Sequence, residues 1–169
     1  MDKQRTKATA LVIMGVSGSG KTTVGKALSI HLDWPFYDGD AFHPARNIEK
    51  MSKGIPLTDE DRQPWLERLN KLMKEHLDKN TSLIVACSAL KKSYREILKK
   101  DLETIQFIFL EGSFDLIMKR MEGREGHFMK AEMLQSQFDT LEKPDDAFII
   151  SIDQSVEKIV KSVLEKLTG

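Results

Sequence analysis

The segment at residues 15–22 constrains this chain more than any other part of its sequence. It reads G-V-S-G-S-G-K-T and matches the pattern G-x-x-x-x-G-K-[ST] at every fixed position. An apolar run at residues 10–14 precedes it, and a helical pattern at residues 21–32 follows it. This strand–loop–helix context separates a phosphate-binding loop from a glycine-rich turn that matches by chance. We therefore predict a nucleoside triphosphate site at this loop.

The predicted loop combines conformational freedom with positive charge. Gly15, Gly18 and Gly20 allow backbone angles that turn successive amides inward around phosphate oxygens. The N-terminus of the following helix adds a partial positive charge, Lys21 neutralises the β- and γ-phosphates, and the Thr22 hydroxyl is a predicted ligand of Mg²⁺. The predicted nucleotide contacts in this segment are Gly15, Val16, Ser17, Gly18, Ser19, Gly20, Lys21, Thr22 and Thr23. The motif leaves open whether the phosphoryl acceptor is water, a protein or a metabolite.

Apolar runs and helical patterns alternate along the rest of the chain. Strands are predicted at residues 10–14, 35–37, 83–87, 105–110 and 147–152. Helices are predicted at residues 21–32, 64–77, 129–141 and 156–167, and a further one begins near residue 114. This alternation predicts a single α/β domain over residues 1–169, built around a mostly parallel sheet. Ligands bind beyond the carboxyl ends of such strands, so the residues that directly follow each strand are site candidates.

The composition excludes several classes of function. The 26 Lys and Arg residues balance the 26 Asp and Glu residues, so the chain lacks the basic excess of a non-specific nucleic-acid binder. Its one cysteine, Cys87, cannot form an intrachain disulfide, and its apolar flanks predict a buried strand thiol. No uncharged run approaches the roughly 18 residues of a membrane span, and the charged N-terminus lacks a signal-peptide pattern. We expect a cytoplasmic protein without nucleic-acid or membrane partners.

Asp38 and Asp40 are the candidate carboxylates on the acceptor side. They follow the second predicted strand, and residues two apart in an extended segment point the same way. We assign Asp40 as the base that takes the proton of the acceptor hydroxyl, and Asp38 as the carboxylate on the metal side. The alternative is structural, with a turn at Asp38 and Gly39 and a helix cap at Asp40.

A polar run follows these carboxylates. If Pro44 begins a helix, Arg46, Asn47 and Lys50 lie on neighbouring faces of it. Such a cationic wall suits a polyhydroxylated acid, and a solvated helix face explains the same spacing equally well. His43 and Arg46 are the candidate substrate contacts in this run.

Several blocks of this sequence together resemble the gluconokinase family of bacteria and eukaryotes. Beside the phosphate loop, they are Asp38-Gly39-Asp40 with His43-Pro44, residues 47–51, 56–59, 61–62 and 64–66, Cys87-Ser88-Ala89-Leu90-Lys91 with Tyr94-Arg95, and residues 126–128, 137–138 and 141–142. The Asp-Gly-Asp-x-x-His-Pro and Cys-Ser-Ala-Leu-Lys blocks are the most specific. The resemblance runs from about residue 11 to residue 163.

The resemblance implies a three-layer P-loop kinase fold close to shikimate and adenylate kinases. Such a fold has a five-stranded parallel sheet of order 2-3-1-4-5 and a small helical lid. The resemblance further implies that ATP phosphorylates D-gluconate to 6-phospho-D-gluconate with release of ADP, that Mg²⁺ is required, and that the protein is a homodimer. One feature departs from the general P-loop pattern, because Cys87-Ser88-Ala89 ends the third strand where an acidic residue is usual. This departure leaves more of the metal binding to Asp38 and water.

Two cations follow the third strand in this reading. Lys91 and Arg95 are four residues apart and would share a helix face, where they could meet the carboxylate of gluconate. Arg62 is a further candidate for that carboxylate. A surface cation beside the acidic residues 59–61 explains Arg62 at least as well.

The lid is predicted at about residues 120–140. Arg120 and Arg124 are four residues apart, Gly123 and Gly126 bracket Arg124, and His127 is a further candidate substrate contact. Closure would bring both guanidinium groups onto the transferring phosphoryl group and the nucleotide. The alternative is an exposed basic helix end, which the helix dipole favours. The predicted catalytic set is Lys21, Asp40 and Arg124.

Three other functions stay open on the sequence alone. Another P-loop kinase, of shikimate or a different sugar acid, would give a different order of kcat/KM in a substrate panel. A nucleotide-binding switch or ATPase would hydrolyse nucleotide without response to gluconate, and it would leave Asp40, His43 and Lys91 without a role. A non-catalytic gluconate sensor is disfavoured because Lys21, Thr22 and Asp40 are all present.

Overall fold

The computed structural model of this protein describes residues 7–122 and 131–168. One parallel sheet of five strands lies at its centre, in the order β2-β3-β1-β4-β5. The strands are β1 (Ala10–Met14), β2 (Phe36–Asp38), β3 (Leu83–Ala86), β4 (Ile105–Glu111) and β5 (Phe148–Ser151). This arrangement confirms the predicted α/β fold and its strand order.

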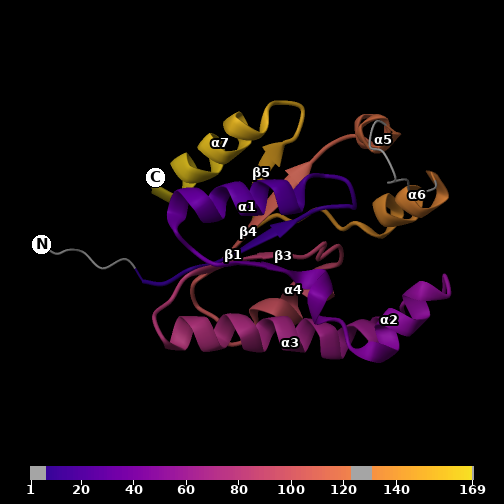
Figure 1. The fold of residues 1–169 in the computed structure, drawn as a ribbon, viewed down its shortest axis with the longest axis horizontal. Coiled ribbons are helices and arrows are strands. Elements are labelled where there is room, and N and C mark those ends of the chain that lie inside the picture. Colours follow the sequence, from indigo (N-terminus) through magenta and orange to yellow (C-terminus); the bar gives the residue numbers. More distant parts are fainter. Residues whose placement is uncertain (1–6, 123–130, 169) are drawn as a thin grey trace, which may run out of the picture.

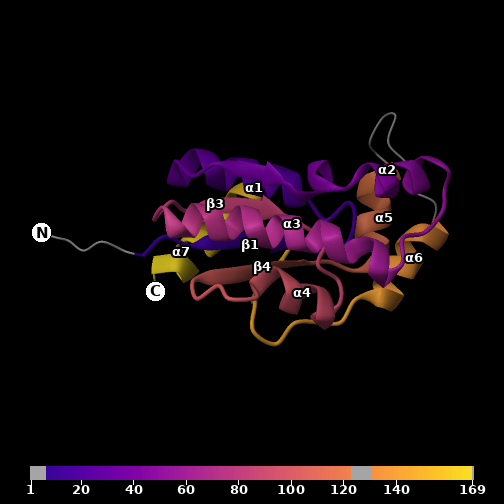
Figure 2. The ribbon, with the colours of Figure 1, turned by 90° about the horizontal axis from the view of Figure 1, so that it is seen from below.

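Helices cover both faces of the sheet and give the molecule three layers (Figure 1). The helices within the described residues are α1 (Lys21–Leu32), α2 (Ala45–Ser52), α3 (Asp59–Asp78), α4 (Lys92–Lys99), α5 (Phe114–Glu122), α6 (Ala131–Thr140) and α7 (Val156–Thr168), with a 3₁₀ turn η1 (Gly39–Phe42). In Figure 1, α1 and α7 lie on one face of the sheet, and α3 and α4 lie on the other. Both views place α2, α5 and α6 at the end of the molecule away from the chain termini (Figure 2). None of the helices in this part of the chain is long and apolar enough to cross a lipid bilayer.

The central strand β1 packs against helices on both of its sides. Leu11 and Ile13 belong to the core under α1 and α7, whereas Val12 and Met14 belong to the core under α3 and α4. Successive side chains of a strand point to opposite faces, so a strand covered on both faces is apolar at every position. This double burial explains the continuous apolar run that the sequence shows at residues 10–14.

The parallel register brings the carboxyl ends of the strands to one edge. Ile13 of β1 and Asp38 of β2 both pair with Ala86 of β3, and Met14 pairs with Phe109 of β4. The loops that leave β1, β2 and β3 therefore begin side by side. This edge faces the end of the molecule that carries α2 and α6 (Figure 1).

Helix α3 begins earlier than the sequence pattern predicted. The pattern placed the start at Pro64, but the helix begins at Asp59 after a capping box. In this box the Thr58 hydroxyl accepts the amide hydrogen of Asp61 at 3.0 Å, and the Asp61 carboxylate accepts that of Thr58 at 2.9 Å. The box satisfies two amides of the first turn, and Pro64 lies inside the helix with its ring exposed to solvent.

Asp61 also joins α3 to α2. Its carboxylate is almost fully buried, lies 2.7 Å from Nζ of Lys50, and lies 3.3 Å from a guanidinium nitrogen of Arg46. The hydrogen bond from Lys50, with those from Thr58, lowers the pKa of Asp61 to about 2. A buried carboxylate with such partners is stable in the folded state only as the anion.

We predict that Asp61→Asn lowers stability most at neutral pH. The folded pKa lies below the value of about 3.9 in an unfolded chain, so the charge stabilises the fold above about pH 4. This contribution is lost as the pH falls through the folded value, so the difference in urea midpoint between wild type and variant should shrink from pH 6 to pH 3. Asp78→Asn is the matched control, because Asp78 pairs with Lys74 at the exposed end of the same helix. A difference for Asp61→Asn that is constant with pH would contradict the assignment.

Candidate active site

The loop between β1 and α1 has the backbone of a phosphate cradle. Gly15, Gly18 and Gly20 have φ angles of 149°, 80° and 99°, in the region that favours glycine. A Cβ atom on Gly15 would lie 2.8 Å from the Ser19 hydroxyl oxygen, so the close turn requires glycine. Gly20 is the residue before the first turn of α1, whose leading amides have no acceptor within the helix. Amides and helix dipole together make an anion site here.

Lys21 folds back over the loop that precedes it. Its Nζ donates to the main-chain oxygens of Gly15 at 3.0 Å and Val16 at 3.1 Å. Burial lowers the pKa of Lys21, while the nearby carboxylates of Asp40 and, more weakly, Asp38 act in the opposite direction. The lysine therefore lies between the loop and the acceptor-side carboxylates.

Helix α6 holds the loop from the other side through Gln137. The Ser17 amide donates to Oε1 of Gln137 at 2.7 Å, and Nε2 of Gln137 donates to the Ser17 hydroxyl at 2.9 Å. The sequence analysis gave Gln137 no role beyond the resemblance. Its position could have indicated a role, because Gln137 is a polar residue on the same helix face as the apolar residues Leu134, Phe138 and Leu141.

One cavity of about 720 Å³ connects the loop to the acceptor side. A second hollow of about 330 Å³ lies along the other side of the loop, where Ser19 and Arg120 contribute to its wall. The sequence-predicted residues that line the first cavity are Ser17, Gly18, Gly20, Lys21, Thr22, Thr23, Asp38, Asp40 and His43. Its size suits a phosphoryl group and a small organic acid together.

Asp38 and Asp40 both line this cavity, but not for the predicted reason. The strand ends at Asp38, and Asp40 lies in the 3₁₀ turn η1 rather than in an extended segment. Asp38 caps this turn by accepting the Asp40 amide hydrogen at 3.0 Å, so the structural alternative holds for Asp38 and not for Asp40. The turn places the Asp40 carboxylate on the exposed wall of the cavity.

Trp65 of α3 organises the acceptor side. Its indole nitrogen donates to the main-chain oxygen of Gly39 at 2.8 Å, which anchors the turn that carries Asp40. The ring of His43 stacks on the Trp65 side chain with centroids 4.1 Å apart and planes 19° from parallel. The sequence pattern identified Trp65 only as a core residue of its helix, because a period of buried positions does not show what the indole nitrogen contacts.

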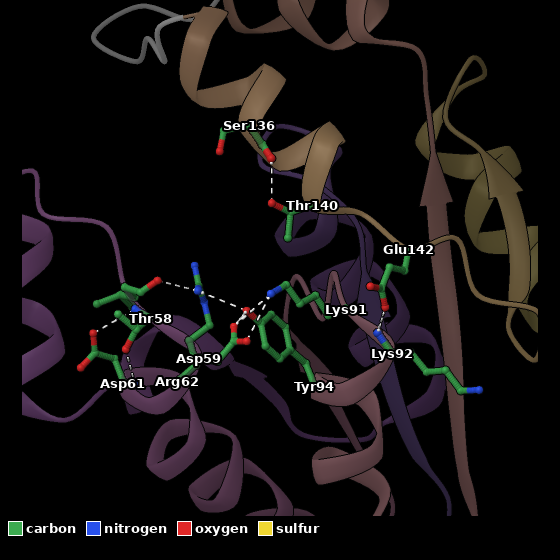
Figure 3. A network of polar contacts seen from close by, with 11 residues as sticks. Thr58, Asp59, Asp61, Arg62, Lys91, Lys92, Tyr94, Ser136, Thr140 and Glu142 are labelled. Carbon is green, nitrogen blue, oxygen red and sulfur yellow. Dashed lines mark hydrogen bonds and ion pairs between the residues drawn. The ribbon is translucent and has the colours of Figure 1, made fainter.

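A polar network lies on the acceptor side and contributes two side chains to the cavity wall (Figure 3). Arg62 donates to the main-chain oxygen of Leu57 at 2.7 Å and to the Tyr94 hydroxyl at 3.2 Å. The Tyr94 hydroxyl donates to Asp59 at 2.6 Å, and Lys91 donates to the same carboxylate at 3.1 Å. Hydrogen bonds from Tyr94 and Lys91 lower the pKa of Asp59. Arg62 and Tyr94 line the cavity, whereas Asp59 and Lys91 do not.

Three predicted substrate contacts lie elsewhere. Arg46 is exposed and pairs with Asp61, and Lys91 pairs with Asp59. The predicted shared helix face of Lys91 and Arg95 is wrong, because Lys91 is the residue before α4 and not part of the helix. The buried Arg95 guanidinium donates to the main-chain oxygens of Ala89, Leu90 and Glu142, since a buried cation needs such acceptors.

Four of the residues singled out for the predicted lid lie in a segment that the structure does not describe. Gly123, Arg124, Gly126 and His127 lie outside the described residues. Arg120 lies in α5, donates to the main-chain oxygen of Ile152, and lines the hollow beside the phosphate loop. Helices α5 and α6 flank the undescribed segment.

Cys87 directly follows β3 and is one of the residues that line the cavity. Its side chain is buried, and burial raises the pKa of the thiol to about 12. A thiol of this kind stays protonated and has little nucleophilic or metal-binding character at neutral pH. Cys87 is therefore a packing residue, as predicted.

The fold and this site define a P-loop kinase of small molecules. The sequence model of the shikimate kinase family matches residues 17–168. The thermosensitive gluconokinase of Escherichia coli K12 is 49% identical over 146 residues, which cover 85% of this chain and 78% of that protein. The crystal structure of a gluconokinase from Sinorhizobium meliloti 1021 superposes with a TM-score of 0.86 at 43% identity, over 97% of this chain and 94% of the other. The shikimate kinase of Aquifex aeolicus shares the fold at 19% identity, with a TM-score of 0.65 over 95% of this chain and 97% of that one.

This chain belongs to the gluconokinase family. The finding confirms the family that the motifs at residues 38–44 and 87–91 indicated.

We predict that Gln137→Met lowers kcat/KM for ATP by roughly tenfold. The change keeps side-chain volume and removes two hydrogen bonds to Ser17, each of which contributes about 1 kcal/mol net. Gln135→Met is the matched control, because Gln135 lies on the exposed side of the same helix, where its side chain donates to Asp139 at 2.8 Å. Steady-state kinetics and melting temperatures of both variants check this. Equal kcat/KM in the two variants would show that the contact does not hold the loop in its working shape.

Proposed function

We propose that this chain transfers the γ-phosphoryl group of ATP to the 6-hydroxyl of D-gluconate, giving 6-phospho-D-gluconate and ADP. The observation that carries this proposal is the single cavity in which a phosphate loop faces Asp40, His43 and Arg62. The identity of 40–49% to gluconokinases over most of the chain supports the choice of substrate. An ATPase or switch would need the loop alone and leaves the acceptor wall unexplained.

In this mechanism the 6-hydroxyl oxygen attacks the γ-phosphorus. The bond from that phosphorus to the β–γ bridging oxygen breaks, and ADP leaves with that oxygen. The proton of the attacking hydroxyl passes to the exposed carboxylate of Asp40, which acts as general base. Lys21 and the amides at the start of α1 stabilise the negative charge on the phosphoryl oxygens. Arg120 and Arg124 are proposed to add charge from the lid side.

The acceptor itself is held by four groups of the opposite wall. Asp40 accepts hydrogen bonds from hydroxyl groups, and His43 and Tyr94 contact the polyol chain. Arg62 is the half-buried cation in this wall and is proposed to bind the gluconate carboxylate. Arg46, Lys91 and Arg95 are left out of this wall, because none of them lines the cavity.

Mg²⁺ fits the residues present if it is held chiefly by water and phosphate. In residues 7–122 and 131–168, no three His, Cys, Asp or Glu side chains gather into a metal site. Mg²⁺ commonly takes only one or two protein ligands beside substrate phosphates, and Thr22 and Asp38 both line the cavity. These two residues would hold the ion, which neutralises phosphate charge when bound. The homodimer and the cytoplasmic location stay predictions from the sequence.

A coupled ADP-release assay across sugar acids, shikimate and nucleoside monophosphates tests the function. We expect kcat/KM for D-gluconate to exceed the others by orders of magnitude, with the product phosphate on carbon 6 by NMR. Preference for shikimate or for another sugar acid would replace the substrate and keep the kinase class. ADP release that does not respond to any acceptor would overturn the proposal in favour of an ATPase.

We predict opposite kinetic signatures for the two carboxylates. Asp40→Asn keeps the shape but cannot take the proton, so kcat should fall by about 10²- to 10⁴-fold while ATP affinity is kept. Asp38→Asn keeps an oxygen that can cap η1, so the turn should stay in place. Because the variant loses the negative charge proposed to help hold the ion, it should weaken Mg²⁺–ATP binding instead. Steady-state kinetics and ATP titration of both variants provide the measurement. If ATP affinity collapses in Asp40→Asn while turnover holds, the two roles are exchanged.

A further inference from the structure

The side-chain amide of Asn47 has a fixed orientation in the interior. Asn47 is only 1% exposed, and its Nδ2 lies 2.9 Å from the main-chain oxygen of Asp61 and 3.1 Å from Nδ1 of His43. A main-chain oxygen only accepts hydrogen bonds, so the group that faces Asp61 must be the amide NH₂. The same nitrogen therefore directs its second hydrogen at His43.

This orientation determines where His43 carries its proton. The Asn47 amide nitrogen only donates, so Nδ1 of His43 must accept and cannot be protonated. A neutral imidazole then has its proton on Nε2. The ring cannot turn over freely, because it is 8% exposed and stacks on Trp65.

We infer that Asn47 is a positioning residue that fixes His43 as a neutral Nε2–H donor toward the acceptor oxygens in the cavity. The inference rests on the proposed function only in taking that acceptor to be a polyhydroxylated acid. His43 then donates where Asp40 accepts, so a hydroxyl can give its hydrogen to Asp40 and receive one from His43. Because Nε2 already carries a proton, His43 cannot serve as the base, and that task stays with Asp40.

The surroundings of His43 favour the neutral ring. A second proton would have to sit on Nδ1, against the NH₂ group of Asn47. Burial lowers the pKa of His43, the Arg62 charge lowers it further, and the Asp40 charge acts in the opposite direction. Both the Asn47 contact and the burial of the ring therefore favour an imidazole that carries a single proton, on Nε2.

The direct test is the protonation state of His43 in the full-length wild-type protein. Histidine labelled with ¹⁵N gives separate ring-nitrogen signals in long-range ¹H–¹⁵N correlation spectra, and the spectrum of His43→Gln assigns those of His43. We expect an unprotonated Nδ1 and a protonated Nε2 from pH 6 to pH 8. A protonated Nδ1, or a charged ring at pH 7, would overturn the inference. This readout does not depend on which acceptor the enzyme uses, so it is separate from a failure of the proposed function.

Asn47→Asp tests the positioning role, because it replaces the donor with an acceptor of nearly the same shape. The proton of His43 should move to Nδ1, and kcat/KM for gluconate should fall roughly tenfold to a hundredfold with ATP affinity unchanged. The matched control is Asn70→Asp. The amide nitrogen of Asn70 also donates to two acceptors, the main-chain oxygens of Leu98 and Lys100, but it contacts neither His43 nor the cavity. It should leave the His43 signals and kcat/KM unchanged.

A double-mutant cycle separates positioning from simple structural damage. The amide nitrogen of Gln can replace Nε2–H as a donor, so His43→Gln should keep more activity than His43→Asn, which cannot reach as far. In the His43→Gln background, Asn47→Asp should change kcat/KM by less than about twofold, because the Nδ1 atom through which Asn47 acts on His43 is no longer present. A loss as large as in the wild-type background would show that Asn47 does not act through His43.

Discussion

The arrangement of this molecule depends on the burial of β1 between β3 and β4. A parallel central strand must hide both of its faces, so α1 and α7 cover one side while α3 and α4 cover the other. The register that results brings the ends of β1, β2 and β3 to one edge. The phosphate loop and the turn that carries Asp40 leave from this edge. Hydrophobic packing around the sheet thus brings the phosphate loop and the turn that carries Asp40 next to each other.

The site also depends on which cations the fold leaves available. The chain has no net charge, and several lysines and arginines near the cavity are already held by carboxylates or main-chain oxygens. These partners hold the cations against neighbouring segments, and Lys50, Lys91 and Arg95 do not line the cavity. Lys21 and Arg62 also donate to main-chain oxygens, but they line the cavity, one beside the phosphate loop and one on the acceptor side. Under the proposed function, this placement gives each of the two anionic substrates a cation of its own.

Helices α2 and α3 form one unit on the acceptor side. The Asp61 carboxylate accepts a hydrogen bond from Lys50 and takes part in the capping box at the start of α3, and the Asp61 main-chain oxygen accepts one from Asn47. Trp65 stacks on His43 and donates a hydrogen bond to the main-chain oxygen of Gly39. A polar side chain buried at such a junction must have its partners satisfied, which also fixes its direction. His43 and the turn at Gly39 are therefore held in place partly by residues, such as Asn47, that do not line the cavity themselves.

The sequence by itself determined the sheet, the phosphate loop and the family. Residues 10–14 and 21–32 were predicted with the bounds that β1 and α1 have, because a buried strand and a glycine-rich turn are set by local pattern and backbone freedom.

Spacing could not decide which side chains enter the cavity. Lys91 and Arg95 seemed suited to an anion, yet long flexible cations turn to whichever acceptor the packed chain offers nearest. The start of α3 required the Thr58 capping box, which outweighed the signal from Pro64. Gln137 meets Ser17, and Asn47 orients His43, only after distant segments pack together, because a hydrogen-bond partner is fixed by position in space and not by distance along the chain.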